Sequence, residues 1–292
     1  MFLWDIIKVI ILGIIQGITE WLPISSTGHL ILFEDMLGLK SVSDGFFDVF
    51  KVVIQFGSII AVIVLYFKTL FPYKRIENAS YGQGFKKDSA LFFKSVANDV
   101  KTWRLWFKIV IACIPTAVFG FLFEDTIDSV LSSNYVIAAA LILYGLAFLW
   151  LENARHRIKC DDLEKLKPHT AFFIGCFQAL ALIPGTSRSG STILGATALG
   201  VSRKTAAEFS FFLAVPVMFG ASALKLIGSA GAFSAKEWLL ILIGSLVSFA
   251  ISMLAIKFLI NYIKKHSFVI FGWYRIILGI VILLVMSWSK LL

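Results

Sequence analysis

The stretch GIIQGITEWLPISSTGHLIL, residues 13–32, carries polar side chains inside a run that is otherwise mostly aliphatic or aromatic. Gln16 and Glu20 precede a proline, Pro23, and a hydroxyl cluster and His29 follow it. Because proline removes a helix hydrogen bond, the segment is expected to form two helices joined by a turn. A carboxylate and an imidazole at such a break require an explanation, since buried polar groups are costly unless they are paired.

The composition of the chain identifies the surroundings of this stretch. Of the 292 residues, 59% are hydrophobic and 15% are charged, and the mean hydropathy is +0.87. A water-soluble fold of this length cannot bury so much apolar surface, so the chain is predicted to be an all-α polytopic membrane protein. Six apolar runs have the length of about 20 residues that crosses a bilayer: 46–66, 105–123, 134–151, 207–227, 237–257 and 268–289.

Two further apolar segments, 5–39 and 171–200, are interrupted by Pro23 and by Pro184-Gly185. Backbone groups freed at such a break are tolerated at membrane depth only where protein or a water-filled cavity surrounds them. Each segment is therefore predicted to be a re-entrant helix hairpin. The alternative is that the two segments form four ordinary membrane spans with short loops. The loops of the rest of the chain would then lie on the same sides of the membrane.

The two interrupted segments resemble each other in sequence. GIIQGITEWLPISSTGHLIL (13–32) and GCFQALALIPGTSRSGSTIL (175–194) share the order Gly, Gln, Pro, hydroxyl residues and aliphatic pair. Three spans separate the hairpins, so the second copy would be inverted, and inverted repeats place their broken helices together near the bilayer midplane. We predict a single integral membrane domain over 1–292, composed of repeat one at about 1–151, a cytoplasmic connector at 152–169 and repeat two at about 170–292.

Charged residues predict the orientation of the chain in the membrane, and the spacing of the cysteines predicts whether they form disulfides. Basic residues concentrate in segments 67–104 and 152–169, so these are expected to be cytoplasmic and both termini to face outward. Arg275 lies near a span end, and its side chain is expected to reach the interface. The N-terminus lacks the features of a signal peptide and is expected to remain in the mature chain. Unpaired spacing predicts no disulfide and no zinc site for Cys113, Cys160 and Cys176.

Polar residues at the two breaks are the candidate site. An ionised carboxylate at the centre of a membrane helix costs about 2.5–3.5 kcal/mol, so Glu20 predicts a functional site with a cationic partner. Gln16 lies one turn before Glu20 on the same face, and Ser26 and His29 share a face of the returning helix. The planar guanidinium of Arg188, at the second break, suits phosphate oxygens. Together these groups predict phosphoryl transfer.

Further hydroxyl residues at the breaks are candidates for contacts to an anion or for helix caps: Ser25, Thr27, Ser187, Ser189 and Thr192. For Ser25 and Thr27 the capping role is the expected one.

These motifs closely resemble the bacterial undecaprenyl pyrophosphate phosphatase family, integral-membrane enzymes linked to bacitracin resistance. The chain carries QxxxE at 16–20, PxSSTGH at 23–29 and PGxSRSxxT at 184–192, and the resemblance covers essentially its whole length. It implies hydrolysis of undecaprenyl diphosphate to the monophosphate and inorganic phosphate on the outer side of the plasma membrane. It also implies a divalent cation, Mg²⁺ or Ca²⁺, and a role in recycling the lipid carrier for peptidoglycan synthesis.

The resemblance also implies roles for individual residues. Glu20 matches the acidic residue and metal ligand, Ser26 and His29 match the SSTGH pair, and Arg188 matches the pyrophosphate-binding arginine. The hydroxyls of Ser187, Ser189 and Thr192 match its supporting groups. Relatives often have a second glutamate at the position of Gln16, so a mechanism that requires two acids is in doubt for this chain.

Several alternatives stay open. Ser26 is the expected nucleophile with His29 as general acid or base, but a His29 phosphoenzyme or direct attack by water suits the same residues. A polyprenyl-phosphate transporter or flippase would show the same repeats without releasing phosphate. An intramembrane serine protease would leave Arg188 unexplained. Expected partners are the lipid substrate and the bilayer; no basic soluble face exists for a nucleic acid, and a homodimer is compatible with the sequence.

Overall fold

The computed structural model describes residues 2–39, 42–72, 95–131, 133–154, 157–229 and 231–289. Within these ranges the regular structure is helical, apart from one isolated bridge between Cys160 and Val201. Seven helices are long and apolar enough to cross a membrane: α1 (Phe2–Thr19), α3 (Phe46–Leu65), α6 (Val100–Leu131), α7 (Asn134–Asn153), α10 (Arg203–Gly228), α11 (Ala235–Ile263) and α12 (Val269–Ser289). The predicted class, an all-α polytopic membrane protein, is confirmed.

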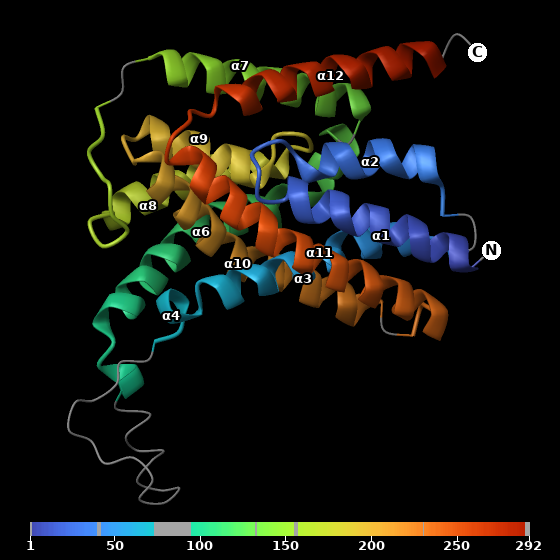
Figure 1. Cartoon of the computed structure of the whole chain (residues 1–292), viewed down its shortest axis with the longest axis horizontal. Helices are drawn as coiled ribbons and strands as arrows, with labels where there is room; N and C mark the ends of the chain where they lie inside the picture. Colours follow the sequence, from blue (N-terminus) through green and yellow to red (C-terminus); the bar gives the residue numbers. More distant parts are fainter. Residues whose placement is uncertain are drawn as a thin grey trace, which may run out of the picture.

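The chain breaks at both positions where prolines predicted it. Helix α1 ends at Thr19, α2 (Ser26–Leu37) follows Pro23, and α8 (Pro168–Ala179) continues through a 3-10 turn (Leu180–Leu182) before α9 (Arg188–Ala198) begins. In Figure 1, α2 lies beside α1 and α9 beside α8, so each pair forms a hairpin. At 18 residues, α1 is itself long enough to span, so it adds a seventh candidate to the six expected spans.

Glycines bring helices of the two halves together in matching ways. A Cβ atom on Gly145 of α7 would lie 2.7 Å from the carbonyl oxygen of Gly272 in α12, and one on Gly279 of α12 would lie 2.9 Å from that of Ala138 in α7. Such close helix contacts are typical of small residues in membranes. Similarly, Gly13 approaches α11 and the corresponding Gly175 approaches α6. These paired contacts support an inverted repeat, whose layout stays a prediction.

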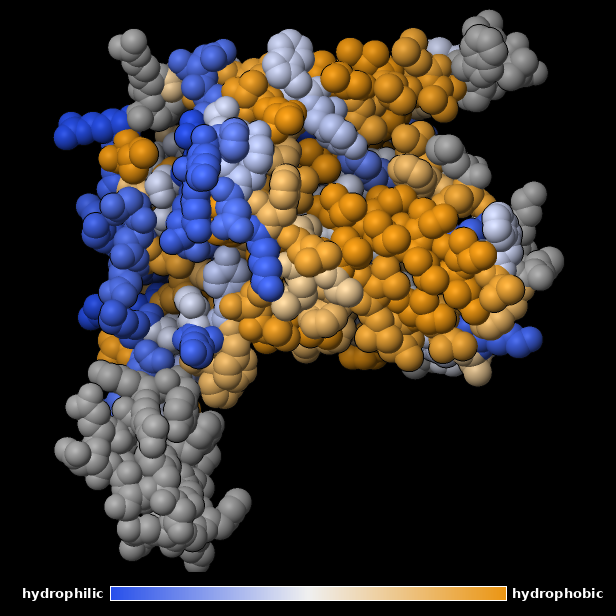
Figure 2. All heavy atoms as spheres, viewed as in Figure 1, coloured by the Kyte–Doolittle hydropathy of each residue, from blue (hydrophilic) through white to orange (hydrophobic). Residues whose placement is uncertain are grey.

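The surface is apolar where lipid would lie. Figure 2 shows hydrophobic side chains over most of the visible face, with hydrophilic residues gathered at one edge, over the α7–α8 and α11–α12 connections. Large apolar side chains such as Phe121 and Leu224 are 89% and 74% exposed, which suits a hydrocarbon solvent rather than water. The protein core includes α10, where Phe209, Phe211 and Phe212 are fully buried.

The basic segment expected to be cytoplasmic lies partly outside the described residues, which omit 73–94. Its described parts are the short helix α4 (Phe67–Leu70) and the start of α6. The loops at 34–48 and 124–133 are acidic and are expected on the opposite side of the membrane. In these loops the side chains of Glu34, Asp35 and Glu124 lie outside the described set.

Candidate active site

The turn after α1 holds a buried carboxylate with two neutral donors. Glu20 is 6% exposed, and Nε2 of Gln16, one helical turn earlier, donates to its Oε2 at 2.8 Å. The hydroxyl of Ser26, the first residue of α2, donates to the same oxygen at 2.9 Å. The carbonyl oxygen of the Gln16 side chain is buried without a hydrogen-bond partner. Three residues predicted from sequence thus converge at the first break.

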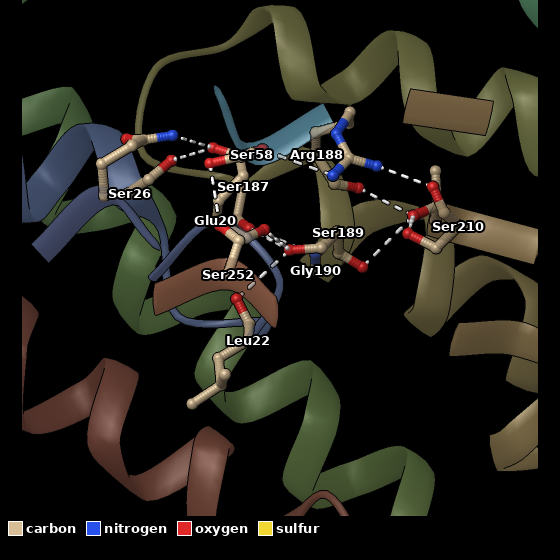
Figure 3. A network of polar contacts seen from close by, with 12 residues as sticks. Glu20, Leu22, Ser26, Ser58, Ser187, Arg188, Ser189, Gly190, Ser210 and Ser252 are labelled. Carbon is tan, nitrogen blue, oxygen red and sulfur yellow. Dashed lines mark hydrogen bonds and ion pairs between the residues drawn. The ribbon is translucent and has the colours of Figure 1, made fainter. Parts of the chain in front are cut away.

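The guanidinium of Arg188 reaches this carboxylate from the second break. Its Nη2 lies 3.3 Å from Oε1 of Glu20, and its Nη1 donates to the backbone oxygen of Ser210 at 2.8 Å. The Cζ atom lies 5.5 Å from the ring centroid of Trp21, and Nε is buried without a partner. Figure 3 shows this network, in which groups from two distant parts of the sequence meet. The cationic partner predicted for Glu20 is therefore Arg188.

Ser25 and Ser187 occupy corresponding places at the two breaks and share a rare backbone conformation. Their φ angles are 72° and 69°, and among the described residues other than glycine only these two are positive. The Oγ atom of Ser25 accepts from the amide of Gly28 at 3.3 Å, and that of Ser187 accepts from the amide of Gly190 at 3.2 Å. A positive φ is sparsely populated for residues other than glycine and costs about 1–3 kcal/mol. Both hydroxyls are thus helix caps at strained turns, a kind of strain that clusters at functional sites.

Other predicted hydroxyls hold the two breaks together. Ser189 is fully buried, and its Oγ donates to the backbone oxygens of Glu20 at 3.1 Å and Leu22 at 3.2 Å. The hydroxyl of Thr192 donates to the backbone oxygen of Arg188 at 2.9 Å, and it lies 2.6 Å from the hydroxyl of Ser210. Thr27, by contrast, is exposed. Ser189 and Thr192 therefore support the backbone of the site.

Arg275 contradicts the expectation that it reaches the interface. Its side chain is fully buried, and it donates to the backbone oxygens of Pro23 at 3.2 Å, Gly185 at 3.0 Å and Thr186 at 2.8 Å. The reason is that proline breaks leave carbonyls without helical partners, and a guanidinium supplies five donors. Arg275 thus links the two breaks. The rule that an ionisable residue inside a span is functional by default would have identified it.

His29 contacts α12 rather than Ser26. Its Nδ1 lies 2.7 Å from the backbone oxygen of Ser25, and its Nε2 lies 2.6 Å from the hydroxyl of Tyr274. The two rings lie nearly parallel and meet edge to edge, with centroids 5.6 Å apart and planes 10° apart. Ser26 donates to Glu20, so Glu20 rather than His29 is the group next to the expected nucleophile. Tyr274 was not identified from sequence, because nothing in its apolar run distinguishes it from a packing residue.

An apolar groove adjoins His29. It has a volume of about 470 Å³ and lies between α1, α2, α11 and α12, with a lining that includes Ile18, Phe33, Phe258, Ile270 and Tyr274. Of these, Ile18, Phe258 and Ile270 also belong to the exposed apolar surface, at 41%, 56% and 56% exposure. The groove is therefore open toward the surface that lipid would cover.

The donor atoms around Glu20 fit a hard divalent cation. Mg²⁺ and Ca²⁺ prefer oxygen ligands, and Mg²⁺ is often held by one or two protein groups together with substrate phosphate and water. The carboxylate of Glu20 and the unpaired carbonyl oxygen of Gln16 are such ligands. In the part of the chain that the structure describes, no three His, Cys, Asp or Glu side chains gather as a metal cluster.

Known proteins match this chain over nearly its whole length. The family model described as Bacitracin resistance protein BacA matches residues 9–281. Undecaprenyl-diphosphatase 1 of Clostridioides difficile (strain 630) is 51% identical over 281 residues, which cover 96% of each chain. Undecaprenyl-diphosphatase of Enterococcus faecalis is 49% identical over 283 residues, which cover 96% of this chain and 97% of the relative. That of Latilactobacillus sakei subsp. sakei (strain 23K) is 48% identical over 288 residues, covering 97% and 98%. The chain therefore belongs to the bacitracin resistance protein BacA family.

Proposed function

We propose that this protein hydrolyses undecaprenyl diphosphate to undecaprenyl phosphate and inorganic phosphate. The observation that carries the proposal is the buried pair of Glu20 and Arg188, 3.3 Å apart, with the hydroxyl of Ser26 on the same carboxylate. Relatives that are 45–51% identical over nearly the whole chain carry the name undecaprenyl-diphosphatase. A buried ion pair adds little to stability by itself, which favours a catalytic reason for it.

Arg188 is the proposed binding group for the diphosphate. One of its nitrogens, Nε, has no partner, and Nη2 makes only the 3.3 Å contact to Glu20. Phosphate oxygens can therefore bind these donors in a bidentate manner. Helix α9 begins at Arg188, so its positive end faces the same place and favours an anion.

Ser26 is the proposed nucleophile and Glu20 the base that accepts its proton, because their oxygens are 2.9 Å apart. The Ser26 oxygen attacks the terminal phosphorus, the bond to the bridging oxygen breaks, and undecaprenyl phosphate leaves with the bonding electrons. Water then attacks the phosphoserine, the bond between phosphorus and the Ser26 oxygen breaks, and Glu20 returns its proton to that oxygen. The released phosphate keeps the protons of the water. A His29 phosphoenzyme or direct attack by water would be distinguished by acid quench with labelled substrate and phosphopeptide mapping.

A divalent cation, Mg²⁺ or Ca²⁺, is the proposed cofactor, held by Glu20 and the carbonyl oxygen of Gln16. When bound, it would neutralise charge on the diphosphate. Gln16 also keeps Glu20 in place, since its Nε2 donates to that carboxylate at 2.8 Å.

The apolar groove beside His29 is the proposed binding place of the isoprenoid tail. Its apolar lining and its exposed rim allow a lipid to enter from the bilayer while its headgroup reaches the breaks. We further propose that the site faces the outer side of the bacterial plasma membrane, which the basic connector supports. There the reaction would recycle the carrier for cell-wall synthesis and confer resistance to bacitracin.

The test measures phosphate released from undecaprenyl diphosphate by detergent-purified protein, with and without a chelator. Glu20→Gln and Arg188→Ala are expected to lower kcat at least about 100-fold, since each removes a group that acts on the transferred phosphoryl. Chelation is expected to abolish turnover. Glu164→Gln is the matched control, because Glu164 pairs with Lys101 at an exposed site. Full turnover by Glu20→Gln or Arg188→Ala would refute the assigned site, and lipid binding without phosphate release by the wild type would favour a transporter.

A further inference from the structure

The imidazole of His29 is fixed by two partners on different helices. Nδ1 lies 2.7 Å from the backbone oxygen of Ser25, which can only accept, so Nδ1 carries a proton. Only Nε2 can therefore exchange a proton with a ligand. In this structure the hydroxyl of Tyr274 occupies that position at 2.6 Å. Any proton that His29 gives to or takes from a substrate thus passes at the atom that Tyr274 contacts.

A phenol suits both protonation states of this nitrogen. Its hydroxyl donates to the bare Nε2 of a neutral ring and accepts from the N–H of an imidazolium. The ring of Tyr274 also lies nearly parallel to the imidazole, with planes 10° apart and centroids 5.6 Å apart, so the two rings meet edge to edge through this hydrogen bond. In a histidine, the hydrogen bond that one ring nitrogen makes determines whether the other ring nitrogen is available for chemistry.

Packing alone does not explain the hydroxyl of Tyr274. The residue lines a groove whose other walls include Ile15, Leu22, Ile24 and Phe33, and its side chain is 42% exposed on the lipid-facing surface. A hydroxyl in apolar surroundings is costly unless it makes a hydrogen bond, and phenylalanine would fill the same volume. The hydrogen bond to His29 is what the hydroxyl provides.

We propose that Tyr274 is a positioning residue that acts through His29, the general acid or base expected from the sequence, in the phosphatase reaction. The proposal rests on the proposed function and adds a residue of α12 to a site otherwise built from the two breaks. A diphosphate that reaches Nε2 replaces the Tyr274 hydroxyl there, while the hydrogen bond from Nδ1 to the backbone oxygen of Ser25 keeps the imidazole in place.

The kinetic test is a double-mutant cycle with Tyr274→Phe, His29→Asn and the double variant. Tyr274→Phe is expected to lower kcat about tenfold, the value of one hydrogen bond, with KM within about twofold of the wild type. In the His29→Asn background the same change is expected to alter kcat less than about twofold, because Tyr274 then has nothing to position. Tyr135→Phe is the control, since Tyr135 is 44% exposed at the start of α7 and does not line the groove, and it is expected to retain wild-type kcat.

A second measurement needs no activity. In protein labelled with ¹⁵N-histidine, the Nε2 resonance of His29 at neutral pH is expected to move downfield in Tyr274→Phe and to stay unchanged in Tyr135→Phe. The proposal is overturned if that resonance does not move, if Tyr274→Phe keeps wild-type kcat, or if Tyr274→Phe lowers kcat equally with and without His29. If His29→Asn has no measurable turnover, the resonance decides. Absence of phosphate release by the wild type would refute the proposed function instead, and the resonance would still report the hydrogen bond.

Discussion

Replacing Arg275 by methionine tests whether one side chain of α12 holds the two helix breaks together. Arg275 is fully buried and makes three hydrogen bonds, to the backbone oxygens of Pro23, Gly185 and Thr186. Methionine fills a similar volume but donates nothing, so three carbonyls at the breaks would lose their donor. The variant therefore separates the hydrogen bonds of the guanidinium from its packing.

The expected loss can be worked out from these contacts. A hydrogen bond from a charged donor is worth about 1.5–3 kcal/mol. The sum of three overstates the loss, because the variant no longer has to bury a guanidinium. Each buried carbonyl left without a donor costs about 1–3 kcal/mol, so for the three carbonyls we expect a net loss of about 3–5 kcal/mol. For a chain of this size it corresponds to a fall in melting temperature of about 10 °C.

The assay follows tryptophan fluorescence on heating and phosphate release in the same preparation. Arg275 touches neither Glu20 nor Ser26, yet kcat is expected to fall about 100-fold, since small displacements of reacting groups cost that much. The melting temperature and kcat of Arg275→Lys are expected to lie between those of the wild type and those of Arg275→Met. The reason is that one ammonium group cannot reach both breaks as the planar guanidinium does. The exposed Arg104 gives the control Arg104→Met. A melting temperature within about 2 °C of wild type, together with normal turnover, would refute the role of Arg275.

Three further predictions concern packing, the cation and orientation. Gly57→Ala is expected to destabilise the protein by about 1–3 kcal/mol, because its Cβ would lie 2.0 Å from a backbone oxygen of α11. In the control Gly220→Ala the new Cβ meets nothing within 4 Å, so this variant should melt at the temperature of the wild type. Gln16→Glu is expected to lower the Mg²⁺ or Ca²⁺ concentration for half-maximal activity about tenfold, since it adds a charged oxygen ligand beside Glu20; an unchanged requirement would place the cation elsewhere. In a cysteine-free background, Lys165→Cys is expected to react with an impermeant maleimide only after cells are permeabilised, and labelling of intact cells would reverse the assigned topology.

The breaks and their partnership were predictable because they depend on local chemistry. Pro23 and Pro184 cannot continue a helix, and a carboxylate inside a span needs a cation, so the pairing of Glu20 with Arg188 followed from the sequence. The structure adds that both capping serines, Ser25 and Ser187, have a positive φ. That similarity supports the repeat that the aligned motifs predicted.

For α12, the rule for ionisable residues inside a span marks Arg275 as a functional candidate, but the partners of Arg275 and the contact of Tyr274 with His29 were not predictable. Which face of α12 meets the breaks depends on how it packs on α7, and the apolar sequence around Tyr274 and Arg275 has no periodic polar face that would indicate it. Counting from the span end placed Arg275 at the interface, although the packing buries it fully. The hydrogen bond from Ser26 to Glu20 was also not predicted, because three residues of separation put His29 on a shared face but do not determine which atoms meet.

The groove between α1, α2, α11 and α12 has a kinetic consequence, since its rim belongs to the lipid-facing surface. A substrate that enters there diffuses in two dimensions and never leaves the bilayer. The concentration that governs turnover is then the mole fraction of the substrate among lipids or detergent molecules rather than its molarity. Diluting the substrate with inert amphiphile at constant bulk concentration should therefore slow the reaction, and Michaelis constants measured in different micelles should agree only when expressed per amphiphile.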